Sequence, residues 1–179
     1  MKQTRYLIYL SLLVTMALVL SLIERTIPVP FMTPGAKLGL ANLVTVLALY
    51  SVPKKRDIAM IIIARLFLTS IFGGSISGLI YGSMGALLSF LIMIWIKETL
   101  KDKVSIIGVS AAGAVFHNIG QVIVSMCIVQ NIGVVLYLPF LSIAGIVTGV
   151  FVGIAANYII TYIYRLPMLK EAIEDCKVV

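Results

Sequence analysis

The fold is decided by stretches such as Ser77–Ile96, SGLIYGSMGALLSFLIMIWI, which runs for 20 residues without a charged side chain. A helix of about 20 apolar residues is long enough to cross the hydrocarbon core of a bilayer. Similar runs recur along the chain, which is 61% hydrophobic and 12% charged, with a mean hydropathy of +1.12. Because a soluble domain carries about 25% charged residues, this composition excludes a water-soluble enzyme and indicates an all-α integral membrane protein.

Six apolar stretches can be drawn within a single membrane domain that covers residues 1–179. They lie at about residues 6–23, 37–52, 58–72, 77–96, 104–129 and 136–164. The second and third stretches are short for a span, and the sixth is long enough to favour a tilted helix. The first stretch is followed by Glu24 and Arg25 without a small-residue cleavage site, so we interpret it as a retained helix and not as a signal peptide.

Basic residues cluster in alternate connections between these stretches. Eleven of the 14 lysines and arginines lie in the two termini and in the second and fourth connections, whereas the first connection and its boundary with the second stretch hold only Arg25 and Lys37. Basic residues collect on the cytoplasmic side of a membrane protein, so we expect six transmembrane helices with both termini cytoplasmic. The net charge of +7 then reflects topology, and we expect the lipid bilayer and no nucleic acid as a partner.

One ionisable residue, Arg65, lies deep within the third stretch. A charged side chain near the centre of a bilayer costs at least about 2.5–3.5 kcal/mol on insertion scales, so it usually faces a cavity or a partner. Arg65 is therefore a candidate for binding an anionic group. The alternative is that its side chain reaches an interface or bonds to carbonyl groups of a neighbouring helix.

The densest polar cluster in the stretches is formed by His117, Asn118 and Gln121, within the sequence AVFHNIGQ. His117 and Gln121 are four residues apart, so they share one face of a helix. Hydrogen bonds between helices are a common use of such residues. Three polar side chains in five positions exceed that need, and we favour the lining of a binding site.

A segment rich in proline and glycine precedes the second stretch. Pro30, Phe31, Pro34 and Gly35 belong to it, and its prolines exclude a regular helix. Irregular backbone at membrane depth is tolerated where it covers a cavity or lies within protein, so we expect this segment to form a capping loop. Lys37 ends it, either as a binding residue or as an interfacial anchor.

Asn42 follows Lys37 on a nearby face and completes the predicted set of substrate-binding residues.

The acidic residues argue against transport that is driven by protons. The chain has seven, and none lies within the predicted stretches, Glu24 being placed just past the end of the first. Because proton-coupled carriers usually contain a buried carboxylate, self-powered proton transport is disfavoured. The two cysteines are 49 positions apart and no paired-aspartate motif occurs, so we expect neither a metal nor a cofactor.

The motifs PGAKLGLAN (34–42), Arg65, FGG (72–74) and HNIGQ (117–121) occur in an order that resembles the Gx transporter family. This family is often labelled heptaprenyl diphosphate synthase component I, and it is similar to the S components of energy-coupling factor (ECF) transporters. The resemblance implies a six-helix S component in a bacterial plasma membrane. It also implies an energising module as partner, with one T subunit and two ATPase subunits.

The main functional hypothesis is a non-enzymatic, substrate-binding subunit for uptake of a small anionic molecule. A vitamin, a flavin-like compound or an isoprenoid or quinone precursor would fit. Lys37, Arg65 and His117 would supply positive potential, and Asn42, Asn118 and Gln121 would supply amide hydrogen bonds. One alternative is a non-catalytic membrane accessory subunit of isoprenoid or quinone (heptaprenyl diphosphate) metabolism. Another is a membrane enzyme with His117 as the base, although no nucleophile accompanies it.

Overall fold

The computed structural model describes residues 2–26, 39–73 and 76–165, and all regular structure in these ranges is helical. Six α-helices occur in them, which confirms the all-α class and the predicted number of helices. They are α1 (Lys2–Thr26), α2 (Asn42–Ser51), α3 (Lys55–Gly73), α4 (Ile76–Leu100), α5 (Ile106–Val129) and α6 (Leu138–Ile163). Short 3₁₀ helices, η1 (Lys101–Lys103) and η2 (Ile132–Tyr137), precede α5 and α6.

Four segments in the described part of the chain are long and apolar enough to cross a membrane. They are Thr4–Glu24, Gly78–Leu100, Ile106–Val129 and Ile132–Ile163. The helix α2 has 10 residues and is only about 15 Å long at the usual rise per residue. The helix α3 has 19 residues, of which four are charged. The six-span topology therefore stays a prediction.

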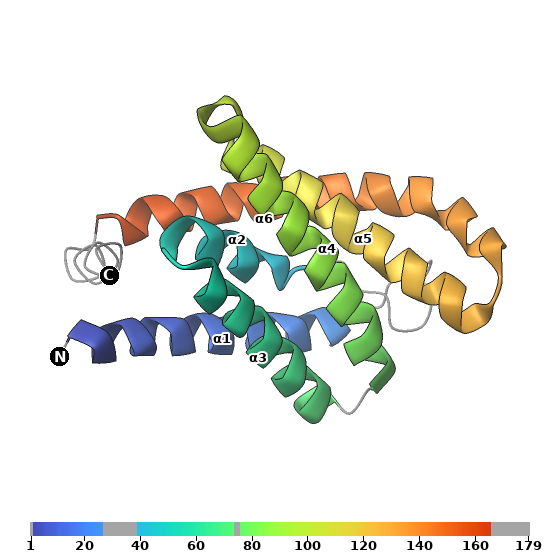
Figure 1. Cartoon of the computed structure of the whole chain (residues 1–179), viewed down its shortest axis with the longest axis horizontal. Helices are drawn as coiled ribbons and strands as arrows, with labels where there is room; N and C mark the ends of the chain where they lie inside the picture. The colour runs from blue at the N-terminus through green and yellow to red at the C-terminus, as the bar shows by residue number, and fades with distance from the viewer. Residues whose placement is uncertain (1, 27–38, 74–75, 166–179) are drawn as a thin grey trace.

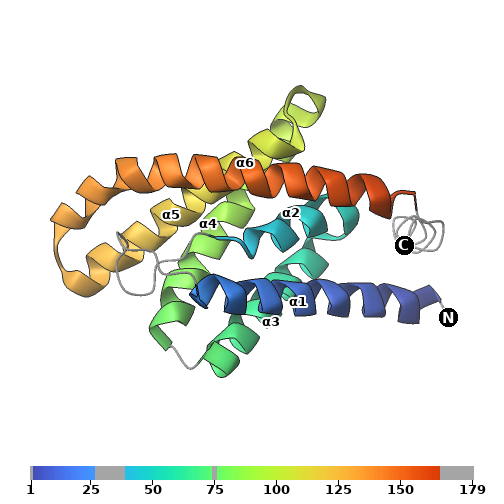
Figure 2. The same ribbon diagram turned by 180° about the vertical axis from the view of Figure 1, so that it is seen from behind.

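The short helix α2 occupies the middle of the bundle, between α1 and α3 on one side and α5 and α6 on the other (Figures 1 and 2). Eight of its 10 residues are buried, so it has almost no surface for lipid. The helix begins at Asn42 and not at residue 37, because the backbone turns at Gly39 (φ +85°). The Asn42 N–H donates to the Gly39 carbonyl at 2.8 Å and closes this turn.

The last turn of α2 is tied to the ends of two other helices. Lys97 of α4 donates to the carbonyl of Leu49, and the hydroxyl of Tyr164 donates to the carbonyl of Tyr50 at 2.8 Å. These carbonyls are among those that a helix end leaves without intrahelical partners. The end of α6 therefore lies beside the end of α2, at the same side of the bundle as the start of α1 (Figure 1).

Three glycines at four-residue intervals bring α6 close to α5. A Cβ atom would lie 2.6 Å from the Ala111 Cα at Gly149 and 2.6 Å from the Ile107 Cα at Gly153. At Gly145, it would lie 2.7 Å from the Asn118 amide nitrogen. Side chains larger than hydrogen do not fit at these distances. The glycine pattern in α6 therefore serves close helix packing, the usual role of small residues between membrane helices.

Large apolar side chains cover the outside of the bundle. Leu12 on α1, Phe67 on α3 and Phe151 on α6 are 61%, 60% and 69% exposed. A soluble monomer rarely exposes large continuous apolar patches. The outer surface of the bundle therefore suits lipid, in agreement with the apolar length of the helices.

Candidate functional site

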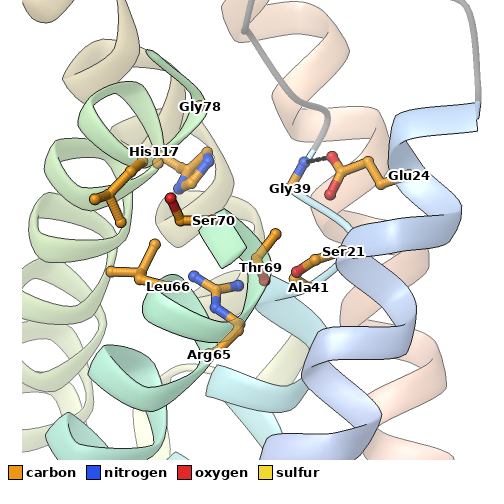
Figure 3. Close-up of a pocket in the computed structure, with 12 residues that line it drawn as sticks. Ser21, Glu24, Gly39, Ala41, Arg65, Leu66, Thr69, Ser70, Gly78 and His117 are labelled. Atoms are coloured by element: carbon orange, nitrogen blue, oxygen red, sulfur yellow. Dashed lines mark hydrogen bonds between the residues drawn. The ribbon is translucent and has the colours of Figure 1, made fainter. Parts of the chain in front are cut away.

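A small cavity lies among α1, α3, α4, α5 and the residues that lead into α2 (Figure 3). Its polar lining side chains are Ser21, Glu24, Arg65, Thr69, Ser70 and His117. The cavity volume is about 20 Å³, which is room for a single water molecule. An organic ligand can enter only if the surrounding helices move apart.

Arg65 of α3 lines this cavity and is 6% exposed. Its position is ten residues after the start of α3, which corresponds to about 15 Å along the helix. The Nε atom of Arg65 is buried and has no hydrogen-bond partner within the described residues. The carboxylate of Glu24 acts on the guanidinium electrostatically. The structure therefore gives the predicted binding arginine an opposite charge on a neighbouring helix.

Glu24 was not predicted as a site residue, and it corrects the expectation that no acidic residue lies within a predicted helix. The helix α1 continues to Thr26, and Glu24 is 4% exposed. The regular spacing of the buried residues of α1 is the signal by which Glu24 could be predicted to face inward. The buried residues of α1 are Tyr6, Tyr9, Leu13, Ala17, Ser21 and Glu24, and steps of three or four residues stay on one helix face.

Gly39 connects Glu24 with the start of α2 and with His117. Its N–H donates to Glu24 Oε1, as Figure 3 shows. The φ angle of +85° is one that residues with a side chain rarely adopt. A Cβ at Gly39 would lie 3.6 Å from the His117 ring. Gly39 therefore places the backbone against both polar groups.

His117 of α5 lines the cavity and is 5% exposed. The Gln121 amide nitrogen lies 3.1 Å from His117 Nε2, so the predicted shared face is confirmed for this pair. When the amide nitrogen donates, Nε2 is the acceptor and the proton of the neutral ring resides on Nδ1. The ring also packs against α4, because a Cβ at Gly85 would lie 2.8 Å from His117 Cε1.

The two predicted asparagines do not line this cavity. The Asn42 amide donates to the Ser89 hydroxyl at 2.8 Å, within the bundle. The Asn118 amide donates to the Leu141 carbonyl of α6 at 2.7 Å, so it faces away from His117. The structure therefore places Arg65 and His117 on one cavity, with Gln121 bonded to His117 outside its lining. It gives Asn42 and Asn118 contacts between helices.

The remaining predicted residues, Lys37 and the capping-loop residues Pro30, Phe31, Pro34 and Gly35, lie outside the described residues. Residues 2–26, 39–73 and 76–165 contain no group of three or more histidine, cysteine, aspartate or glutamate side chains that could hold a metal ion. The groups that can act in the cavity are therefore hydrogen-bonding and ion-pairing side chains.

Comparison with known proteins places most of the chain in one family model. The model described as heptaprenyl diphosphate synthase component I matches residues 13–159. The match includes all of α2 to α5 and the cavity-lining residues of α1. No curated protein and no solved structure matches the chain.

Proposed function

Since the chain belongs to the family described as heptaprenyl diphosphate synthase component I, we propose that it is a non-catalytic membrane subunit that binds a small molecule for uptake. The bound molecule carries an anionic group that Arg65 receives. One observation carries this proposal. A buried arginine lines a cavity, and its Nε has no partner within the described residues.

The cost of burying Arg65 supports a binding role. Helix packing alone does not require a guanidinium, because an apolar side chain of similar size would fill the space without desolvating a charge. An arginine presents five N–H donors in a planar arrangement that suits carboxylate and phosphate groups. A ligand with an anionic group would use the Nε donor, which the described residues leave without a partner.

In the proposed topology, all six helices cross a bacterial plasma membrane and both termini are cytoplasmic. The cavity would then lie towards the outer side, because it is lined by the end of α1 and the start of α4. Cysteines placed in Lys54–Arg56 and in Gln130–Val135 should react with impermeant reagents from opposite sides. Labelling of both from one side would exclude this topology.

Uptake in this proposal depends on a partner that supplies energy. The chain shows no ATP-binding P-loop, and the resemblance to ECF S components favours a module with a T subunit and two ATPase subunits. Such a module would move the loaded subunit and release the molecule inward. Copurification of ATPase subunits with the tagged protein from native membranes would support this partner.

Mass spectrometry of the purified protein under native conditions tests the binding proposal. We expect a retained small molecule in the wild type and about 10- to 100-fold lower occupancy in Arg65→Ala, since hydrogen bonds to charged groups contribute about 1.5–3 kcal/mol. His117→Ala should also reduce occupancy. Arg56→Ala is the matched control, because Arg56 is exposed on the same helix. Unchanged occupancy in Arg65→Ala, or a loss of expression alone, would oppose a binding role.

The second candidate is an accessory subunit of isoprenoid or quinone metabolism that acts as a membrane scaffold. The family description favours it, because "component I" of a synthase implies a further component. In that case the polar cavity would be structural, and a prenyl synthase catalytic subunit would copurify in place of the ATPases. The same purification therefore separates the two candidates.

A further inference from the structure

The cavity contains two opposite charges that belong to different helices. Glu24 on α1 and Arg65 on α3 are 4% and 6% exposed, and both line it. Figure 3 shows Glu24 of α1 beside Gly39, and Arg65 of α3, among the side chains that line it. An isolated buried charge is very costly, and each group lowers the cost of burying the other. The described part of the lining therefore has one fixed negative and one fixed positive group.

Glu24 is held in place by a contact that does not involve Arg65. Its Oε1 atom accepts a hydrogen bond from the Gly39 N–H, next to α2. A ligand anion that reached Arg65 would leave this contact intact, so Glu24 would remain in the lining. A carboxylate can accept about four hydrogen bonds through its two oxygens. Glu24 can therefore also accept a hydrogen bond from a ligand.

The two charges restrict the ligands that the cavity can accept. A simple mono-anion would gain the Arg65 N–H donors but would place a second negative charge near Glu24. Like charges in a poorly solvated site repel strongly. A diphosphate would bring still more negative charge to a single arginine that already has a counter-ion. A ligand that also has a donor or a positive group avoids this repulsion.

We propose that the cavity selects an amphoteric small molecule, which presents an anionic group to Arg65 and an N–H or O–H donor to Glu24. Zwitterionic amino acids belong to this class. Simple carboxylic acids and prenyl diphosphates do not. This inference rests on the proposed binding function and adds the charge class of the ligand.

Affinity selection with a defined mixture tests the charge class. The purified full-length protein is incubated with equimolar amino acids, nucleobases, simple monocarboxylates and prenyl diphosphates, and retained compounds are measured by mass spectrometry. We expect the wild type to retain at least one amphoteric compound more than tenfold over the monocarboxylates and diphosphates. Glu24→Gln should reverse this preference towards mono-anions, because it leaves Arg65 as the remaining charge of the described lining.

Glu98→Gln is the matched control, because Glu98 is an exposed acidic residue near the other end of α4, paired with Lys55. It should retain the wild-type preference. Equal retention of mono-anions and amphoteric compounds by the wild type, unchanged in Glu24→Gln, would overturn the charge class but leave the binding function standing. If no compound is retained more by the wild type than by Arg65→Gln, the binding function fails as well. If Glu24→Gln does not fold, the wild-type ratio decides alone.

Discussion

Substitution of Gly85 by alanine should separate α4 from α5 at the functional cavity. A Cβ at Gly85 would lie 2.8 Å from Cε1 and 2.9 Å from Nδ1 of His117, and 2.9 Å from the His117 carbonyl oxygen. Extra atoms in a well-packed interior cost about 1–3 kcal/mol. A Cβ at Gly82, on the same helix, would lie 3.4 Å from Leu66 Cδ2, an ordinary contact. Gly82→Ala is therefore the matched control.

The comparison isolates the steric effect. Both substitutions gain about 0.5–1 kcal/mol from replacing a helical glycine by alanine, and this gain cancels between them. For a protein of 150–250 residues, 1 kcal/mol corresponds to about 2–4 °C in the unfolding midpoint. We therefore expect Gly85→Ala to unfold about 2–12 °C below Gly82→Ala, measured by thermal unfolding of the two variants in the same detergent.

A second substitution identifies the source of the clash. Two of the three close atoms belong to the His117 ring, and the third is backbone. His117→Ala should therefore restore part of the stability lost in Gly85→Ala, and the double-mutant cycle measures the coupling. If Gly85→Ala is as stable as Gly82→Ala, the ring does not pack against Gly85, and the described geometry of the cavity is wrong.

Three further predictions concern the supports of the bundle. Gly149→Ala should destabilise more than Gly85→Ala in the same assay, because its Cβ would lie 2.6 Å from the Ala111 Cα, and backbone yields less than a side chain. Tyr9→Phe should cost about 0.5–1.5 kcal/mol of stability through loss of the buried 2.7 Å bond to Ser51. Ser51→Ala should then cost less stability in the Tyr9→Phe variant than in the wild type. Ser105→Ala removes the cap of α5 and should cost about 0.5–2 kcal/mol, whereas Ser105→Thr should be close to the wild type; equal losses for both would exclude capping.

Much of the helical architecture could be predicted from the sequence because membrane helices are long and continuous. Runs such as residues 77–96 exceed the bilayer thickness, and α4 covers this run in full. The boundaries of α2 could not be predicted in this way. Its start depends on the positive φ of Gly39, and most of its residues are buried by other helices, so no lipid-facing pattern marks its ends.

The candidate site was predicted in part because side-chain direction depends on helical phase. His117 and Gln121 share a face, and the structure pairs them. Asn118 follows His117 by one residue, which rotates its side chain by about 100° around the helix. It therefore reaches α6 and not the cavity. Glu24 could not be predicted from the apolar run, which stops at Ile23, because α1 continues to Thr26. The spacing of the buried residues marks its position instead.

The bonding of the last turn of α2 also has a consequence for synthesis in the membrane. The helix is made early, but the donor to Leu49 is on α4 and the donor to Tyr50 follows α6. Until those segments emerge from the ribosome, both acceptors require other partners. A helix of 10 residues also lacks the length that drives independent insertion. The protein therefore reaches its native core late, and a nascent chain truncated before α6 should remain sensitive to membrane proteases at α2.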